Sequence, residues 1–324
     1  MSAADTPFLT ADVGGTHARI ALMRTDHDAL SMLAYHKYLC ADYPSLGAIL
    51  QDFIATRVHE PPHTCTLACA GYLQDGMVVN YNLPWQVSMT ELCSTLGIER
   101  ISVINDFEAV AHAARFVDAA KTLQLGGPHQ AAGTLVVIGP GTGLGSAVSI
   151  PAKPHDLVLA TEAGQMSLAP DTEIEREILA RLAGDLPYVS YERVLCGPGL
   201  VTLYRALGQI RAMPATLSTP EAVTASALGR SDHLAEETLQ VFCALLGSYA
   251  GNLALAYGAR GGVYLTGGIL PAMRGFLAHS HLMPRFLAKE RMRGFLERIP
   301  VKLLEQNQLG VLGAARWHLR QRKT

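Results

Sequence analysis

The sequence predicts an α/β protein with two domains of similar architecture, and three observations support this prediction. A chain of 324 residues has about twice the length of a typical domain. Short β-type apolar runs alternate with helical patterns along most of the chain. A strand that ends in glycines and returns as a second strand occurs twice, with its glycines at 14–15 and within 139–145. Because this unit repeats far along the chain, we expect two related domains.

The first half begins with the glycine hairpin, formed by strands at Phe8–Val13 and 18–23, which places Asp12 near the end of a strand. A strand at 101–104 delivers Asn105 and Asp106 to the start of an Ala-rich helix. Capping residues and terminal glycines set the helix ends, as with Ser88, Glu91 and Gly97. The other strands are expected at 33–39 and 64–70, and the helices at 45–57, 88–96 and 107–116.

The second half repeats the hairpin and then becomes mostly helical. Strands at 135–138 and 146–150 flank the sequence GPGTGLG. Thr172 and Glu175 form a capping-box pattern, and the apolar face of a long helix at 233–257 indicates packing on a sheet. Further helices are expected at 172–182, 200–207, 220–228 and 310–321, and strands at 262–266 and 301–304.

The composition excludes several classes of protein. Hydrophobic residues make up 49% and charged residues 17%, which is typical of a globular core and not of a disordered tail. The formal net charge is −2 and no dense basic run precedes the last six residues, so nucleic acid is not an expected partner. The N-terminus lacks the features of a secretory signal, and the six scattered cysteines suit reduced thiols, so a cytoplasmic location is expected. Glycines and polar residues interrupt the apolar stretch 239–265, so we expect no membrane span.

Three glycine clusters follow predicted strands: DVGGT at 12–16, GPGTGLG at 139–145 and TGG at 266–268. Without a Cβ, glycine lets several backbone N–H groups point to one centre, which suits phosphate oxygens. An ordinary tight turn is the alternative for any one cluster alone. The GxxxxGK[ST] motif is absent, and GPGTGLG leads into β-type sequence where a dinucleotide fold requires a helix. A phosphate site of another type is therefore predicted.

Motifs in a specific order extend this interpretation over nearly the whole chain. They are LTADVGGTHARIAL, NLPW, VINDFEAVAHAA, GPGTGLGSAV, TEAGQMSLAP, YERVLCGPGL, GNLALAYGARGGVYLTGGILP and LGVLGAARW. In this order they resemble the bacterial glucokinase family outside the ROK group, within the hexokinase, actin and Hsp70 superfamily. The resemblance implies two ribonuclease-H-like (actin-like ATPase) α/β domains, each a mixed sheet flanked by helices, with the active-site cleft between them. It places the smaller domain at 1–115 plus 306–324 and the larger, helix-rich domain at 116–305.

The resemblance also implies a function, the transfer of a phosphoryl group from ATP to the 6-hydroxyl of a hexose, with glucose as the expected substrate. Such an enzyme would act in glycolysis, a part of glucose metabolism. The resemblance also implies a homodimer. Asp106 takes the place of the general base, and Asp12 that of the carboxylate that holds Mg²⁺ through water. The implied ATP-binding residues are Gly14, Gly15, Thr16, Gly141, Thr142, Gly143, Gly267 and Gly268. The implied sugar-binding residues are Asn82, Asn105, Asp106, Glu162, Gln165 and Glu192.

Elementary chemistry agrees with these roles and leaves alternatives open. Mg²⁺ keeps most of its waters and needs one or two carboxylates besides phosphate oxygens, and ionised carboxylates accept several hydroxyl hydrogen bonds. An Asn-Asp pair before a helix is, however, also an N-cap pattern. Asp12 also fits a strand-end turn, and an isolated Glu192 also fits a solvated surface. Cys65 and Cys69, with His63 nearby, fit core thiols better than a metal site.

Two departures from the family pattern leave the substrate open. Glu162-Ala163-Gly164-Gln165 has glutamine where the family has a sugar-contacting histidine, and His17 stands where asparagine is common. Glutamine donates and accepts hydrogen bonds but is never charged, so the preferred hexose is in question. A kinase for another sugar or amino sugar is the alternative. A weakly active sugar-sensing regulatory protein of the same fold is a second alternative.

Overall fold

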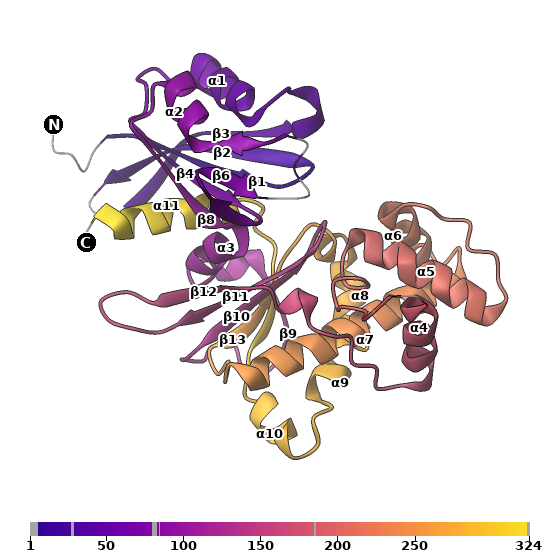
Figure 1. The fold of residues 1–324 in the computed structure, drawn as a ribbon. Helices are drawn as coiled ribbons and strands as arrows, with labels where there is room; N and C mark the ends of the chain where they lie inside the picture. Colours follow the sequence, from indigo (N-terminus) through magenta and orange to yellow (C-terminus); the bar gives the residue numbers. More distant parts are fainter. Residues whose placement is uncertain (1–5, 27–28, 80–82, 84, 185, 323–324) are drawn as a thin grey trace. The chain divides into compact units, whose positions relative to one another are not determined.

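The structure is a computed structural model that describes residues 6–26, 29–79, 83, 85–184 and 186–322. The chain divides into two compact units (Figure 1). The first contains Met1–Phe116 and Gln306–Thr324, and the second contains Val117–Glu305. The chain therefore leaves the first unit after residue 116 and returns to it at residue 306.

The first unit is built on a five-stranded sheet with the strand order β3-β2-β1-β4-β8. Its strands are β1 (Phe8–Val13), β2 (His17–Asp26), β3 (Ala29–Leu39), β4 (Thr64–Cys69) and β8 (Arg100–Asn105). The first three strands run antiparallel, whereas β1, β4 and β8 are parallel to one another. Val13, Cys69 and Asn105 are register partners across these parallel strands, so the three strands end at one edge of the sheet.

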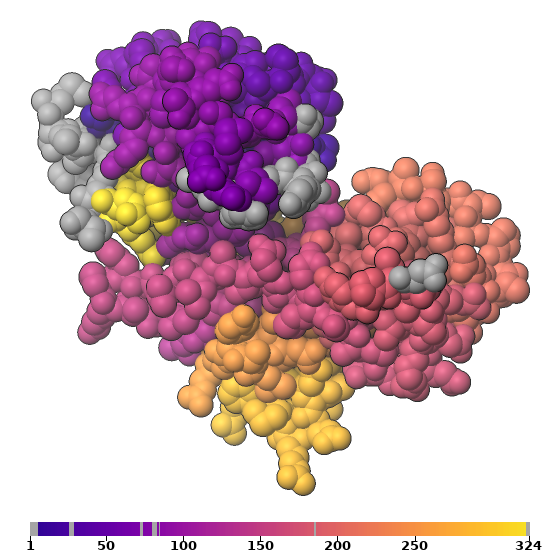
Figure 2. Space-filling model, viewed as in Figure 1, coloured from indigo at the N-terminus to yellow at the C-terminus, as the bar shows by residue number. Residues whose placement is uncertain are grey.

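Alternate residues of β1 face opposite sides of this sheet. Leu9, Ala11 and Val13 belong to the core that contains residues of α1 (Leu46–Arg57), whereas Phe8 packs with the C-terminal helix α11 (Leu309–Arg322). In Figure 2 the yellow residues of the C-terminal segment lie against the violet residues of the N-terminal segment. The helices of this unit are α1 (Leu46–Arg57), α2 (Met89–Leu96), α3 (Asp106–Ala114) and α11 (Leu309–Arg322). A small sheet is formed by β5 (Tyr72–Gln74), β6 (Met77–Val79) and β7 (Val87–Ser88).

The second unit repeats this arrangement in a six-stranded sheet with the order β12-β11-β10-β13-β14-β9. Again a hairpin and a third strand run antiparallel, and the first hairpin strand is parallel to the next strand in the sheet. The predicted repeat of a glycine hairpin in two related sheets is therefore confirmed. The strands are β9 (Thr122–Gly126), β10 (Leu135–Pro140), β11 (Leu144–Ile150), β12 (Leu157–Thr161), β13 (Gly262–Leu265) and β14 (Val301–Leu304).

Helices dominate the rest of the second unit. They are α4 (Glu173–Ala183), α5 (Gly197–Arg211), α6 (Pro220–Leu228), α7 (His233–Ala256), α8 (Arg274–His279), α9 (Leu282–Leu287) and α10 (Arg293–Leu296). Among the helices of the described residues, α7 alone has the length and composition to cross a membrane. Because 78% of its most apolar 18-residue stretch is buried inside the structure, α7 is the core helix that the sequence predicts.

Two boundaries differ from the prediction in ways that concern the candidate site. Strand β11 begins at Leu144, so the second glycine turn consists only of residues 141–143. Helix α5 begins at Gly197 rather than at residue 200, because the Cys196 thiol caps it and Pro198 fits the first helical turn. The elements that were not predicted are short or lie at an edge: β5, β6, β7, β9, β12 and α8 to α10.

Candidate active site

The first glycine turn joins β1 to β2 and is held by two hydrogen bonds from Cys40. Its N–H donates to the Thr16 carbonyl at 2.9 Å, and its thiol donates to the Gly14 carbonyl at 3.4 Å. Gly14 N–H also donates to the carbonyl of His17. Gly14 and Gly15 are half-buried, and Thr16 is exposed. The turn is thus held through the carbonyl groups of Gly14 and Thr16 and through the Gly14 N–H, while the Thr16 side chain is exposed.

Asp12, just before this turn, is confined by two other elements of the first unit. Arg19, its register partner on β2, places Nη1 at 3.2 Å from Oδ2. Gly310, in the first turn of α11, lies so close that a Cβ there would stand 2.6 Å from Oδ2. Burial raises the pKa of Asp12, although the charge of Arg19 and its hydrogen bond act in the opposite direction.

The surroundings of Asp12 fit a weakly held Mg²⁺ ion. No cluster of three or more His, Cys, Asp or Glu side chains that could hold a metal occurs within the part of the chain that the structure describes. Mg²⁺ does not require such a cluster, since one carboxylate with phosphate oxygens and waters satisfies it. Asp12 is therefore one carboxylate of the first unit that could contribute to such a site.

Asn105 and Asp106 stand where β8 ends and α3 begins, at the strand edge where β1 also ends. Asn105 is the N-cap, and its Oδ1 accepts from the N–H groups of Phe107 and Glu108 at 2.9 and 3.1 Å. Asp106 Oδ1 accepts from Phe107 N–H at 2.9 Å. The capping interpretation of Asn105 is confirmed. Because its oxygen serves the cap, its amide NH₂ group is what it can offer to a ligand, and the hydrogen bond from Phe107 N–H orients the Asp106 carboxylate.

The second glycine turn, residues 141–143, is held closely at both ends. Gly141 N–H donates to the Gly143 carbonyl, and the Gly141 carbonyl accepts from Gly197 N–H, both at 2.8 Å. A Cβ on Gly143 would stand 2.6 Å from Oε2 of Glu192. Thr142 at the tip of the turn is exposed. As in the first turn, a threonine side chain faces outward between tightly packed glycines.

The third cluster lies beside the second, because β13 is parallel to β10. Gly267 has a φ of +103°, and a Cβ there would overlap the Pro140 carbonyl. A positive φ and a close backbone approach both require glycine at this position. Gly268 is exposed, and a Cβ there would have no neighbour within 4 Å. Gly267 therefore serves packing, whereas the space around Gly268 is open.

Glu192, Gln165 and Glu162 are brought together in the second unit. Glu192 Oε1 accepts from Gln165 Nε2, and its Oε2 accepts from Leu144 N–H, both at 2.8 Å. Glu162 is exposed and precedes the short 3₁₀ helix Ala163–Gln165, where its carbonyl accepts from Gln165 N–H. The solvated-surface interpretation of Glu192 is wrong, because the side chain is half-buried and bound at both oxygens. Asn82, the remaining candidate, lies outside the described residues.

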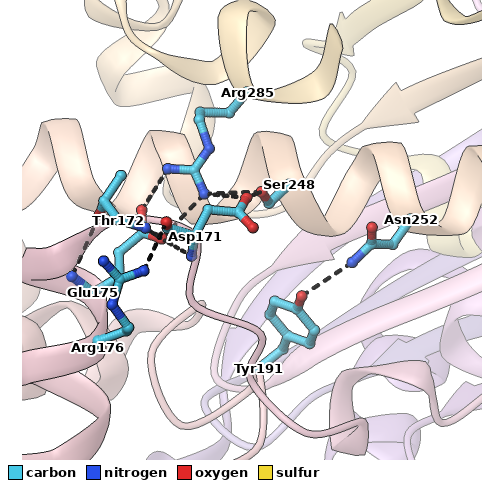
Figure 3. Close-up of polar contacts among 8 residues, drawn as sticks. All are labelled: Asp171, Thr172, Glu175, Arg176, Tyr191, Ser248, Asn252 and Arg285. Atoms are coloured by element: carbon cyan, nitrogen blue, oxygen red, sulfur yellow. Dashed lines mark hydrogen bonds and ion pairs between the residues drawn. The ribbon is translucent and has the colours of Figure 1, made fainter. Parts of the chain in front are cut away.

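The segments 164–166 and 191–192 pair with each other and hold these side chains in place. Tyr191 N–H donates to the Met166 carbonyl and Glu192 N–H to the Gly164 carbonyl, so the two segments pair like strands. The hydroxyl of the buried Tyr191 accepts from Asn252 Nδ2 of α7 at 3.1 Å (Figure 3). The sequence interpretation missed Tyr191 and Asn252 because they are far apart in the chain.

An ion-pair network fixes the segment that follows. Arg285 of α9 contacts Glu175 of α4 and Asp171, each at 2.6 Å, and Ser248 of α7 donates to Asp171 at 2.9 Å (Figure 3). Burial alone would raise the pKa of Glu175, but hydrogen bonds from Arg285 and from the backbone N–H of Asp171, with the charge of Arg285, hold it below its ordinary value. The network connects α4, α7 and α9 to Asp171, which follows Gln165 in the chain.

The remaining candidates of the sequence are packing residues. Trp85 is half-buried and donates from Nε1 to the Tyr43 carbonyl at 3.0 Å. Cys65 and Cys69 are buried, as expected for core residues.

Comparisons with known proteins place this geometry in a family. The family model described as Glucokinase matches residues 9–321. A glucokinase-like protein of Xylella fastidiosa is 43% identical over 98% of this chain and 96% of its own length. A glucokinase of Paramagnetospirillum magneticum is 38% identical over 95% of this chain and 96% of its own length. The crystal structure of a glucokinase from an Antarctic psychrotroph has a TM-score of 0.84 and 35% identity, covering 97% of this chain and 99% of that one.

Proposed function

The chain belongs to the glucokinase family, and from this premise we propose that it catalyses glucose + ATP → glucose 6-phosphate + ADP. The observation that carries the proposal is the position of Asp106. Its carboxylate is oriented by a helix cap at the strand edge where the strand of Asp12 also ends. A carboxylate so placed suits the acceptance of a proton from a sugar hydroxyl.

In this proposal Asp106 is the general base. It accepts the proton of the 6-hydroxyl as that oxygen attacks the γ-phosphorus of ATP and the bond to the β-phosphate oxygen breaks. Because the transition state of phosphoryl transfer is loose, the residue contributes chiefly by positioning the hydroxyl in line with the leaving group. The bond from Phe107 N–H holds one carboxylate oxygen and so limits rotation of the base.

The glycine turns form the proposed nucleotide site. Backbone N–H groups of Gly15 and Gly143, and the outward threonines Thr16 and Thr142, suit phosphate oxygens, whereas Gly14 shapes the first turn through its bond to the His17 carbonyl. Gly141 shapes the second turn, and Gly267 and Gly268 form the surface proposed for the adenosine. Mg²⁺, when bound, neutralises charge that develops on the phosphates. Asp12 is the proposed partner of that ion through water.

The hexose site that we propose uses Asn105, Asp106, Glu162, Gln165 and Glu192, with Asn82 retained as a prediction. Carboxylates that accept several hydroxyl hydrogen bonds reject analogues that lack those hydroxyls. The two compact units are the proposed smaller and larger domains of the kinase. We further propose that the enzyme is a homodimer, that it is located in the cytoplasm and that it acts in glycolysis.

An ADP-release assay on the purified full chain with Mg-ATP tests this function. Glucose is expected to give ADP and glucose 6-phosphate in equal amounts. Asp106→Asn keeps an oxygen for the Phe107 cap but loses the base, so kcat should fall by about 10²- to 10⁴-fold. Glu108→Gln, a carboxylate-to-amide change in the same helical turn, is the matched control. If no hexose yields ADP, the reaction is wrong, and if Asp106→Asn is fully active, the base is wrong.

Gln165 supports one second candidate, a kinase for another sugar or amino sugar. Its Nε2 donates to Glu192, so the other end of the amide, an uncharged acceptor, is available to a ligand. A panel of hexoses and amino sugars, measured on the wild type and on Gln165→His, separates the two candidates. An unchanged order of kcat/KM would remove Gln165 from the choice of substrate. Hexose binding without ADP release would instead favour a sugar-sensing protein.

A further inference from the structure

The carboxylate of Glu192 is shared between two parts of the candidate site. Oε1 accepts from the Gln165 side chain, and Oε2 accepts from the backbone N–H of Leu144, each at 2.8 Å. Leu144 is the first residue after the turn 141–143. Glu192, one of the residues proposed to bind the sugar, is therefore also hydrogen-bonded to the residue that follows the proposed phosphate-binding turn.

Close backbone packing makes this connection stiff. A Cβ on Gly143 would stand 2.6 Å from Glu192 Oε2, and a Cβ on Gly164 would overlap the Leu144 carbonyl. Glu192 N–H in turn donates to the Gly164 carbonyl at 2.9 Å. Since closely packed interiors transmit small displacements, we expect a shift of the Glu192 carboxylate to displace the turn through the hydrogen bond to Leu144.

The chain after Glu192 returns to the other end of the same turn. The Glu192 carbonyl accepts from the Cys196 thiol at 3.1 Å, and that sulfur caps α5 by accepting from Gly199 N–H at 3.3 Å. The next residue, Gly197, donates its N–H to the Gly141 carbonyl at 2.8 Å. Residues 192–197 therefore hold the turn at Gly141, its first residue, and at Leu144, the residue directly after it.

We propose that Glu192 positions the turn 141–143 and couples hexose binding to nucleotide binding. This inference rests on the proposed function, which assigns phosphates to that turn and hydroxyls to Glu192. A carboxylate beside a phosphate site repels the phosphates unless hydrogen-bond donors neutralise its charge. Gln165 and Leu144 supply two donors, and hexose hydroxyls add further ones. Bound hexose therefore lowers the repulsion and raises nucleotide affinity, and the coupling is reciprocal.

Calorimetric titration of the full-length protein with MgADP, with and without saturating glucose, measures this coupling. In the wild type, glucose is expected to tighten ADP binding by about fivefold or more. Glu192→Gln removes the charge, while its amide oxygen still accepts from Leu144 N–H. It should tighten ADP binding in the absence of sugar by about threefold or more and bring the effect of glucose close to none.

Two further variants distinguish this role from simple sugar binding. Gln165→Leu removes a donor from the carboxylate without changing the turn, so it should weaken sugar-free ADP binding, opposite in sign to Glu192→Gln. Glu162→Gln, a nearby exposed carboxylate, should change the hexose affinity but keep the coupling ratio at saturating glucose. Matching thermal unfolding midpoints of all variants show that each is folded.

The outcomes also separate this inference from the proposed function. If the wild type phosphorylates glucose but binds ADP equally with and without it, the coupling is wrong. The same holds if Glu192→Gln leaves sugar-free ADP affinity unchanged. If the wild type binds ADP but no hexose, the proposed function fails, while the opposite signs of the two sugar-free effects still support the link between Glu192 and the turn. A wild type that binds no ADP overturns both.

Discussion

The Asp12 side chain lies against Gly310, a residue far away in the sequence that leaves room for it. Gly310 lies inside a helix, where alanine is ordinarily more stable by about 0.5–1 kcal/mol. At this position a Cβ would stand 2.6 Å from Asp12 Oδ2, while Arg19 holds the same oxygen at 3.2 Å. The carboxylate therefore has little freedom to move, and Gly310 is explained by the room that Asp12 needs.

Gly310→Ala should displace the Asp12 carboxylate while it favours the helix. If Asp12 supports the metal, we expect the Mg²⁺ concentration for half-maximal activity to rise several-fold, with an unfolding midpoint within a few degrees of the wild type. Gly313→Ala in the same helix is the contrasting variant. A Cβ there would overlap the Ala109 backbone, so it should lower the midpoint by overpacking, at a cost of about 1–3 kcal/mol. An unchanged Mg²⁺ dependence in Gly310→Ala would remove Asp12 from the metal site.

At the scale of elements, the start of α5 connects helix stability to the second glycine turn. The sequence GPG looks like a loop, and cysteine is not among the favoured cap residues, so the sequence predicts a helix start at residue 200, three residues after the observed start at Gly197. The Cys196 sulfur nevertheless accepts from Gly199 N–H, and Gly197 binds the turn at Gly141. The cap therefore stabilises both the helix and the turn.

Cys196→Ala should remove this cap and cost about 0.5–2 kcal/mol of stability, because the first-turn N–H groups lose an acceptor. The KM for ATP should rise as the hold on Gly141 loosens. Cys196→Ser restores an acceptor with a better capping residue, so its unfolding midpoint and KM should match or exceed the wild type. Thermal unfolding and ATP titrations give both quantities. Equal losses in the alanine and serine variants would indicate that thiol packing, and not the cap, is what matters.

The Arg285 network is a largely buried electrostatic link between α4 and α9 of the second unit (Figure 3). Glu175 is 2% exposed and Arg285 13%, so removing the arginine leaves a buried carboxylate unpaired. Arg285→Met should therefore destabilise the protein by about 3–5 kcal/mol. Arg211→Met breaks an exposed pair with Glu237 and should cost no more than about 1 kcal/mol. Thermal unfolding of the two variants at pH 7 compares them, and similar losses would contradict a special role for the buried pair.

At the scale of the whole molecule, periodic and repeated features were predictable from the sequence, and long-range contacts were not. The glycine hairpins, the long α7 and the cap at Asn105 follow from local patterns. The bond between Glu192 and Leu144 joins residues far apart in the chain, and no spacing signals it. Short elements such as α9 and β12 form because tertiary packing outweighs weak local preference. The grouping of Glu162, Gln165 and Glu192 came from family resemblance, and only the structure shows how they contact.

The two units also differ in how acid should affect them. Burial alone would raise the pKa of Asp171, but hydrogen bonds from Ser248 and Arg285 and the charge of Arg285 lower it below its ordinary 3.8. The pKa of Glu175 likewise lies below its ordinary 4.5. With folded pKa values below unfolded ones, the stabilisation is complete above pH 4.5 and is lost as the pH falls through the lowered values. Both groups belong to the second unit.

Tryptophan placement makes this difference measurable. The chain has two tryptophans, Trp85 and Trp317, and both belong to the first unit, whereas most helices belong to the second. Near pH 3, below the ordinary pKa values of both groups, we expect the helical circular dichroism signal to melt at a lower temperature than the tryptophan fluorescence signal, with the gap narrowing at pH 7. Arg285→Met should open the same gap at pH 7, and Arg211→Met should not. Coincident transitions in every case would show that the two units unfold as one cooperative structure, since separate units must lose their cores separately.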